Sequence, residues 1–215
     1  MRTMTVVGNG TVKKKPDYTV ISLTQKSLDP DYETAVREAG EQLEALRGAL
    51  SRVGFSKDDL KTNSFNVYSE YEGVNDEHGN YINRFKGYAC VQGLSVAFDF
   101  DSKKLGETLS AIAGCVAEPE LSIRFTVKDA NAVNRELLKS AAENARERAE
   151  VLAAASGVRL GALESCSYRF GDREYASQTT YGMERPRLMK ANAVMDFAPE
   201  EITASDEVTF VWNIE

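Results

Sequence analysis

The clearest hydrophobic pattern lies between Glu120 and Phe170, where it predicts a strand, a long helix and a second strand. Residues 121–127 alternate apolar and polar side chains, which is the period of a strand with one buried face. From Ala130 the apolar positions recur at steps of three and four, as in an amphipathic helix. They are Val133, Leu137, Ala141, Ala145, Ala149 and Leu152. Asp129 is suited to cap this helix and Gly157 to end it. We expect this unit to be the stability core.

Two strands and a helix are predicted in the N-terminal part of the chain, before residue 54. Apolar residues favour strands from Met4 to Val12, interrupted at Gly8-Asn9-Gly10, and from Tyr18 to about Leu28, with a turn over residues 13–17. Asp29-Pro30-Asp31 predicts a helix start, because Asp caps free N–H groups and Pro fits the first turn. The apolar stripe of this helix is Tyr32, Val36, Ala39, Leu43, Leu46, Leu50 and Val53.

The middle and the end of the chain predict a long hairpin, a short helix and a last strand. The hairpin arms run from Ser64 to Tyr71 and from Arg84 to Phe100, and Gly87 and Gly93 indicate bulges or close packing. Asp101 can cap the short helix. Its apolar stripe is Leu105, Leu109, Ile112 and Val116. Residues 208–214 alternate as a strand, whereas residues 171–201 keep no period and predict a long irregular segment.

These elements follow the order ββαββαβαββ. Each strand–helix–strand unit needs a crossover helix on a sheet, whereas the hairpin needs only antiparallel neighbours. The sequence therefore predicts the α+β class, as a mixed β-sheet with helices packed on one face. Within it, residues 18–127 have the βαββαβ order of a ferredoxin-like unit. We expect one domain over residues 1–215.

Charge and composition narrow the range of functions. The chain has 33 Asp+Glu and 26 Lys+Arg, a net charge of -7, which argues against a nucleic-acid partner. The apolar run from Ala111 to Ala117 is far shorter than the roughly 20 residues of a membrane helix, so we expect no membrane insertion. The N-terminus has no apolar stretch typical of a signal peptide, which predicts a cytoplasmic location, or a periplasmic or surface one if an export signal has been removed.

No sequence motif predicts a cofactor or a metal. Gly8-Asn9-Gly10 resembles the start of a dinucleotide fingerprint, but a third glycine and a following helix are missing. Cys90, Cys115 and Cys166 are odd in number and lack C-x-x-C spacing, so they predict free thiols. The single histidine, His78, falls in the expected hairpin tip. We expect chelators and reducing agents to leave the fold unchanged.

Several polar groups have a structural and a functional interpretation. Asp58 and Asp59 could couple as acid and base or hold a cation, although a solvated connection accounts for them as well. Lys13-Lys14-Lys15 could receive an anionic partner or form a solvated turn. Tyrosines around the hairpin could stack a ligand or pack across strands; they are Tyr68, Tyr71, Tyr81 and Tyr88.

The irregular segment supplies the candidate interaction site. It mixes cations with apolar side chains, a pattern suited to an adaptable contact with protein. These candidate residues are Arg185, Arg187, Leu188, Met189 and Lys190, around Pro186.

Motifs along nearly the whole chain resemble those of the SIMPL-domain family. They are Val7-Gly8-Asn9-Gly10 leading to Pro16-Asp17, Lys57-Asp58-Asp59-Leu60-Lys61-Thr62, Lys86-Gly87-Tyr88, Ser156-Gly157, Leu188-Met189-Lys190-Ala191 and the terminal strand with Trp212. The family includes bacterial periplasmic or outer-membrane immunogenic proteins, oxidative-stress-associated proteins and a eukaryotic adaptor associated with a Pelle-like kinase. The resemblance implies an α+β protein able to assemble into ring-like oligomers, without a catalytic motif.

Two functions of different classes follow. The first is a non-enzymatic protein of oligomeric assembly or interaction, with a homo-oligomer as the expected state and a role related to stress or the cell envelope. The alternative is a small-molecule-binding protein or a hydrolase that uses surface carboxylates such as Asp58, Asp59 or Asp101. A pocket with convergent polar groups would favour the alternative, and an extensive subunit interface would favour the first.

Overall fold

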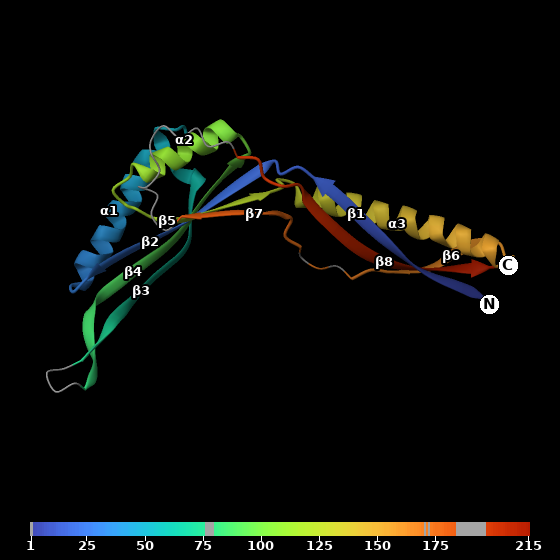
Figure 1. Ribbon diagram of the computed structural model, residues 1–215, viewed down its shortest axis with the longest axis horizontal. Coiled ribbons are helices and arrows are strands. Elements are labelled where there is room, and N and C mark those ends of the chain that lie inside the picture. Colours follow the sequence, from blue (N-terminus) through green and yellow to red (C-terminus); the bar gives the residue numbers. More distant parts are fainter. Residues whose placement is uncertain (1, 76–79, 170, 172, 184–196) are drawn as a thin grey trace. The chain divides into compact units, whose positions relative to one another are not determined.

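The computed structural model describes residues 2–75, 80–169, 171, 173–183 and 197–215 (Figure 1). Over these residues the chain forms eight strands and three α-helices in the order ββαββαβαβββ, with a short 3-10 helix at Lys57–Asp59. The predicted α+β class is confirmed. The order contains one strand more than the sequence predicts.

The chain divides into two compact units. Unit 1 comprises Met1–Asp17, Thr126–Gln178 and Pro199–Glu215, and unit 2 comprises Tyr18–Phe125 and Thr179–Ala198. Whether the two units fold together as the single expected domain stays a prediction.

A five-stranded sheet carries two helices on one face (Figure 1). Its strand order is β3-β4-β2-β5-β7. The strands are β2 (Tyr18–Asp29), β3 (Leu60–Asn75), β4 (Tyr81–Asp99), β5 (Glu120–Thr126) and β7 (Ala176–Met183). The helices are α1 (Tyr32–Ser51) and α2 (Ser102–Ala113). Leu46 of α1 and Leu109 of α2 are fully buried in the core that includes Ile21, Leu94 and Phe125 of the sheet.

The ferredoxin-like unit is confirmed by the strand order. The run β2-α1-β3-β4-α2-β5 places β4 between β2 and β3, and places β2 between β4 and β5. Each helix therefore crosses over one intervening strand. β2 and β3 both pair antiparallel with β4, as such interleaving requires.

Unit 1 contains a three-stranded sheet under one long helix (Figure 1). Its order is β1 (Thr3–Lys14), β8 (Ile202–Ile214) and β6 (Leu160–Ser167), with β8 antiparallel to both neighbours. The helix is α3 (Ala130–Ala155), whose alanine stripe packs on Val6, Phe210 and Trp212.

Helix α3 approaches β1 very closely because two strand positions are glycines. A Cβ atom built on Gly8 would lie 2.0 Å from the carbonyl oxygen of Ala141, and one on Gly10 would lie 2.1 Å from that of Leu137. Gly8-Asn9-Gly10 therefore does not interrupt the strand, which runs on through both glycines. Gly8 and Gly10 allow α3 to pack closely on β1.

The helix caps and the bulges agree with the sequence. Asp31, Asp101 and Asp129 each accept a hydrogen bond from the backbone N–H three residues on, at 3.0, 2.6 and 2.8 Å. The β3–β4 register shifts opposite Gly87 and beside Gly93, where the sequence predicts bulges.

Several details of the predicted fold are wrong. The strands form two antiparallel sheets instead of one mixed sheet, and β5 and β6, expected to flank α3 in one unit, belong to different sheets. A period-2 pattern shows that a segment is a strand with a buried face, but it does not specify the neighbour. Val116 and Leu152, expected in apolar stripes, are exposed, and Ala153 is buried in place of Leu152.

The prediction of an irregular segment over residues 171–201 is also wrong, because β7 lies inside it. Strand β7 is a polar edge strand, so its apolar period is too weak to recognise. Of the apolar side chains in this segment, Tyr175 and Phe197 are buried and Tyr181 packs on the unit 2 core.

Candidate functional site

The first exposed apolar surface is an arm formed by the β3–β4 hairpin. We use the name aromatic arm for residues 64–75 and 81–88. Its aromatic rings form a ladder of edge-to-face contacts, from Tyr71 to Phe85 (5.7 Å between centroids), from Phe85 to Tyr88 (5.3 Å) and from Tyr88 to Tyr32 of α1 (5.6 Å). Of the tyrosines predicted to pack across strands, Tyr71 does so on Phe85, whereas Tyr88 packs on Phe85 of its own strand and on Tyr32 of α1.

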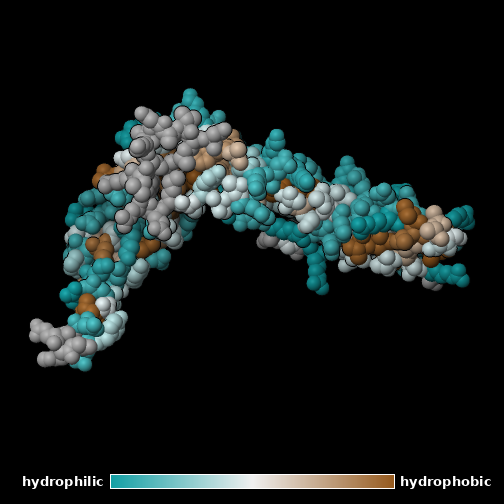
Figure 2. Space-filling model, in the orientation of Figure 1, coloured by the Kyte–Doolittle hydropathy of each residue, from teal (hydrophilic) through white to brown (hydrophobic). Residues whose placement is uncertain are grey.

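Much of the ring surface on the arm remains exposed. The side chains of Phe65, Tyr68, Tyr71 and Phe85 are between 42% and 58% exposed. Figure 2 shows brown patches along this part of an otherwise hydrophilic surface. Exposed aromatic side chains gathered on one element are typical of contact sites.

The opposite face of the arm is held by ion pairs. The Lys26 ammonium donates a hydrogen bond to the carboxylate of Glu70, which also lies 3.4 Å from Lys86. This bond from Lys26 holds the pKa of Glu70 below its usual value, and Glu70 raises the pKa of Lys26. Arg84 pairs with Glu72 across the hairpin. The arm thus has one face with the ladder of rings and one face with ion pairs, which also carries Tyr68.

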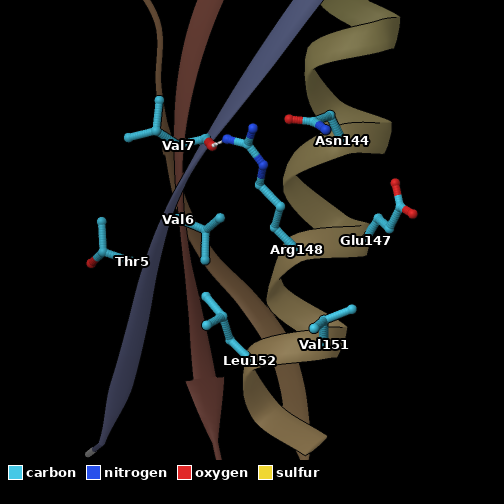
Figure 3. A pocket seen from close by; sticks show the side chains of 8 residues that line it. All are labelled: Thr5, Val6, Val7, Asn144, Glu147, Arg148, Val151 and Leu152. Atoms are coloured by element: carbon cyan, nitrogen blue, oxygen red, sulfur yellow. Dashed lines mark hydrogen bonds between the residues drawn. The ribbon is translucent and has the colours of Figure 1, made fainter. Parts of the chain in front are cut away.

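The second apolar surface is a groove between β1 and the C-terminal half of α3. This cleft of about 700 Å³ is lined by Thr5, Val6, Val7, Asn144, Glu147, Arg148, Val151 and Leu152. In Figure 3 the side chains of Val6 and Leu152 point into the space between the strand and the helix. The guanidinium of Arg148 crosses the upper end of this space to the carbonyl oxygen of Val7, at 3.0 Å.

Side chains of α3 also cover part of the open edge of β1. The backbone N–H of Asn9 donates to Asn144 Oδ1 at 3.0 Å, and that of Thr11 donates to Ser140 Oγ at 3.3 Å. Together with Arg148 on Val7, these bonds occupy outward-facing groups of an edge strand. Occupied edge groups cannot pair with a further strand.

A buried carboxylate lies elsewhere in unit 1. Asp206 accepts hydrogen bonds from Tyr168 (2.9 Å), from Arg173 (2.6 Å) and from the backbone N–H of Glu207 (2.8 Å). Burial, and then the bond to Asp206, raise the pKa of Tyr168. Asp206 is fully engaged and joins residues 168 and 173 to β8.

The carboxylates considered for hydrolysis have structural partners. Asp59 accepts hydrogen bonds from the backbone N–H and the hydroxyl of Ser56, at 2.7 and 2.9 Å, which hold the pKa of Asp59 below its usual value. Asp101 caps α2. Asp58 lies exposed in the 3-10 helix beside them. This geometry gives two of the three carboxylates a capping role.

The remaining candidates separate into described and undescribed residues. Lys14 pairs with Glu136 of α3 at 2.7 Å. Cys90 and Cys115 are buried free thiols, and Cys166 is an exposed one. His78 and the predicted interaction residues Arg185, Arg187, Leu188, Met189 and Lys190 lie outside the described residues.

Sequence reasoning missed the groove. Its walls come from residues about 140 positions apart, and the helical period of the sequence places Leu152 in the buried stripe. The signal that could have found it was Gly8-Asn9-Gly10, which allows the close approach of a helix. Within the described chain, no cluster of three or more metal-ligating side chains is present. Nor does any helix there have the length and apolar character needed to span a bilayer.

The fold and its surfaces define an α+β protein with a ferredoxin-like sheet, a second sheet under a long helix, and two exposed apolar surfaces. The chain belongs to the SIMPL family, described as a protein of unknown function (DUF541), whose profile matches residues 4–212. It is similar to the uncharacterized protein YggE of Edwardsiella ictaluri (strain 93-146), with 22% identity over 207 residues that cover 96% of this chain and 84% of the relative.

Proposed function

We propose that the chain is a non-enzymatic interaction protein that assembles with copies of itself through the aromatic arm. The observation that carries this proposal is the row of half-exposed aromatic rings along β3 and β4. Aromatic side chains dominate the energetics of protein contacts because each can bury a large apolar area. A role in stress or at the cell envelope remains part of the proposal, on the grounds of the resemblance in sequence.

Light scattering on the purified protein tests assembly. We expect a mass that is a multiple of the 23.7 kDa chain. The double variant Phe65→Ser/Tyr71→Ser should shift the mass to that of a single chain, because it removes exposed rings without touching the core. Leu152→Ser is the matched control, since Leu152 is exposed to a similar degree in the other unit. A parent protein of one-chain mass would overturn the proposal.

The segment around residues 185–190 stays a proposed contact with protein. Its test must leave β7 and Phe197 in place, because both belong to the structure of unit 2. Replacing only residues 184–196 with a Gly/Ser linker meets this requirement. We expect weaker assembly with an unchanged melting temperature. Unchanged assembly would remove the segment from the proposal and leave the role of the arm intact.

A second candidate function is the binding of a small amphipathic molecule in the groove between β1 and α3. The volume of the groove lies in the range of ligand sites, and its walls are mostly apolar with a few polar groups at the rim. Binding of an anilinonaphthalene sulfonate dye tests this. Leu152→Glu should abolish the fluorescence gain, whereas Leu163→Glu, an equally exposed leucine on β6, should not. Equal dye signals from both variants would count against a site in the groove.

A further inference from the structure

Backbone N–H and C=O groups of β1 point alternately towards β8 and outward from the sheet. The N–H of Ile214 on β8 donates to the carbonyl of Arg2, at 3.1 Å, so the even-numbered residues of β1 face β8 and the odd-numbered ones face outward. Strand β1 is also the outermost strand of its sheet. The outward groups of its odd-numbered residues therefore form an open edge wherever no side chain covers them.

One row of side chains on α3 follows this edge. Four residues of a helix advance about 6 Å and two residues of a strand about 6.7 Å, so a row in steps of four keeps pace with the outward residues. Three polar members of the row bond to the edge at 3.0 to 3.3 Å. The pairs are Ser140 with Thr11, Asn144 with Asn9 and Arg148 with Val7.

The fourth member of the row is Leu152, and the next outward residue of β1 is Thr5. Both line the groove between β1 and α3. A leucine side chain has no donor or acceptor for a backbone group. Within the described residues, no hydrogen bond reaches the outward N–H or C=O of Thr5. The edge of β1 is thus covered as far as Val7 and open at Thr5, and the opening lies in the groove.

The open groups of Thr5 favour an extended peptide as the occupant of the groove. The apolar walls include Val151 and Leu152, which are 63% and 48% exposed. A hydrocarbon chain laid on these walls would cover the N–H and C=O of Thr5 without bonding to either group, which is unfavourable. A peptide strand can bond to both groups and place an apolar side chain on the walls.

Only the end of a peptide fits this edge. From Val7 onward the edge of β1 is occupied by the side chains of Arg148, Asn144 and Ser140. A strand that adds beside Thr5 therefore cannot continue past Val7, because the groups it would need there already have partners. The charge at this point decides which end of the peptide is favoured.

Arg148 selects a carboxyl terminus. The other cations of α3 lie 3.0 to 3.8 Å from a carboxylate; they are Arg135, Lys139 and Arg146. Within the described residues Arg148 forms no ion pair, and it bonds to the carbonyl of Val7. In Figure 3 its guanidinium points towards β1, whereas the carboxylate of Glu147 points away from the strand. A guanidinium with donors to spare favours a carboxylate partner.

We propose that the groove binds the C-terminus of a partner polypeptide, with an apolar last residue, as a strand parallel to β1. The inference rests on the groove being a binding site, the second candidate function above, and names its ligand. In a parallel pair, the carbonyl of Thr5 accepts from the N–H of the last residue, and the N–H of Thr5 donates to the carbonyl of the third residue from the end. The last side chain then lies on the face of Val6, against Leu152, and its carboxylate reaches Arg148.

Calorimetric titration with a synthetic peptide tests the inference on the full chain. The probe is acetyl-Ser-Gly-Thr-Val-Thr-Val with a free C-terminal carboxylate, and the matched control is the same peptide with a C-terminal amide. We expect the acid form to bind at least about tenfold more tightly, because the amide loses the charge-assisted pair with the guanidinium. Equal affinities of the two forms, or binding of neither, would overturn the inference.

Two arginine variants locate the carboxylate. Arg148→Gln should remove the difference between the acid and the amide form. Arg146→Gln, the same change on the same helix at an arginine paired with Glu150, should preserve it. A difference that persists in Arg148→Gln would place the carboxylate elsewhere and contradict the inference.

A proline variant tests the backbone bonds. Thr5→Pro removes an N–H that points away from β8, so it leaves the ladder intact and should weaken binding of the acid form about tenfold. Lys13→Pro removes an outward N–H outside the groove and should not weaken binding. Melting temperatures show that both variants are folded. Binding unaffected by Thr5→Pro would count against strand addition.

The dye experiment separates this inference from the candidate function beneath it. Dye binding that depends on Leu152, without binding of the acid peptide, would defeat the peptide ligand and leave the groove as a site. Binding of neither the dye nor the peptide would defeat both.

Discussion

Gly8 and Gly10 lie where α3 crosses β1, and their missing side chains set the distance between the two elements. Gly8→Ala should lower the free energy of unfolding by about 1–3 kcal/mol, because its Cβ would overlap the backbone of α3. Urea denaturation measures the change. Gly48→Ala is the control, since nothing lies within 4 Å of a Cβ there, and a gain of about 0.5–1 kcal/mol is expected in the middle of a helix. A neutral Gly8→Ala would contradict the close approach.

Tyr168 makes the stability of the protein depend on pH in the alkaline range. Its pKa is raised in the folded protein, by burial and then by its hydrogen bond to Asp206. The contribution of Tyr168 to the free energy of unfolding is complete below its pKa in the unfolded chain, about 10. It is lost as the pH rises through its pKa in the folded protein. The melting temperature of Tyr168→Phe should therefore fall less steeply than that of the parent above pH 10. Parallel pH profiles would show that the bond to Asp206 has no such effect.

At the scale of elements, α3 holds unit 1 together through one face only. Leu137 is fully buried between Val12, Val133 and Ile202, whereas Leu152 on the same helix is about half exposed. Leu137→Asp should cost about 3–5 kcal/mol, because it buries an unpaired charge, and Leu152→Asp should change stability by less than about 0.5 kcal/mol. Thermal melts of the two variants provide the comparison. Equal losses would mean that the buried face of α3 is wrongly assigned.

At the scale of the whole molecule, the expected single domain can be tested with a natural probe. Trp212 is the one tryptophan of the chain, and it is buried in unit 1. If both units unfold as one domain, tryptophan fluorescence and far-ultraviolet circular dichroism give coincident urea transitions. Leu109→Ala, which creates a cavity in unit 2, should then lower both midpoints. A fluorescence midpoint that stays fixed in this variant would show independent units.

The sequence by itself determined the local structure, since local signals act over a few residues. The caps at Asp31, Asp101 and Asp129 and the bulges near Gly87 and Gly93 follow from side-chain and backbone chemistry at those positions. The βαββαβ order of the ferredoxin-like unit also followed, because alternation and helical period identify the type of each element. The family could be recognised for the same reason, from short motifs in a fixed order.

Only the tertiary structure decided which strands are neighbours and which apolar positions stay exposed. The period of a strand carries no information about its partner, so the division of β5 and β6 between two sheets was not predictable from alternation. The buried stripe of α3 runs in steps of four from Leu137 through Ala149 to Ala153, so Leu152 lies beside the stripe and stays exposed. The groove and the aromatic arm are therefore products of packing between distant residues.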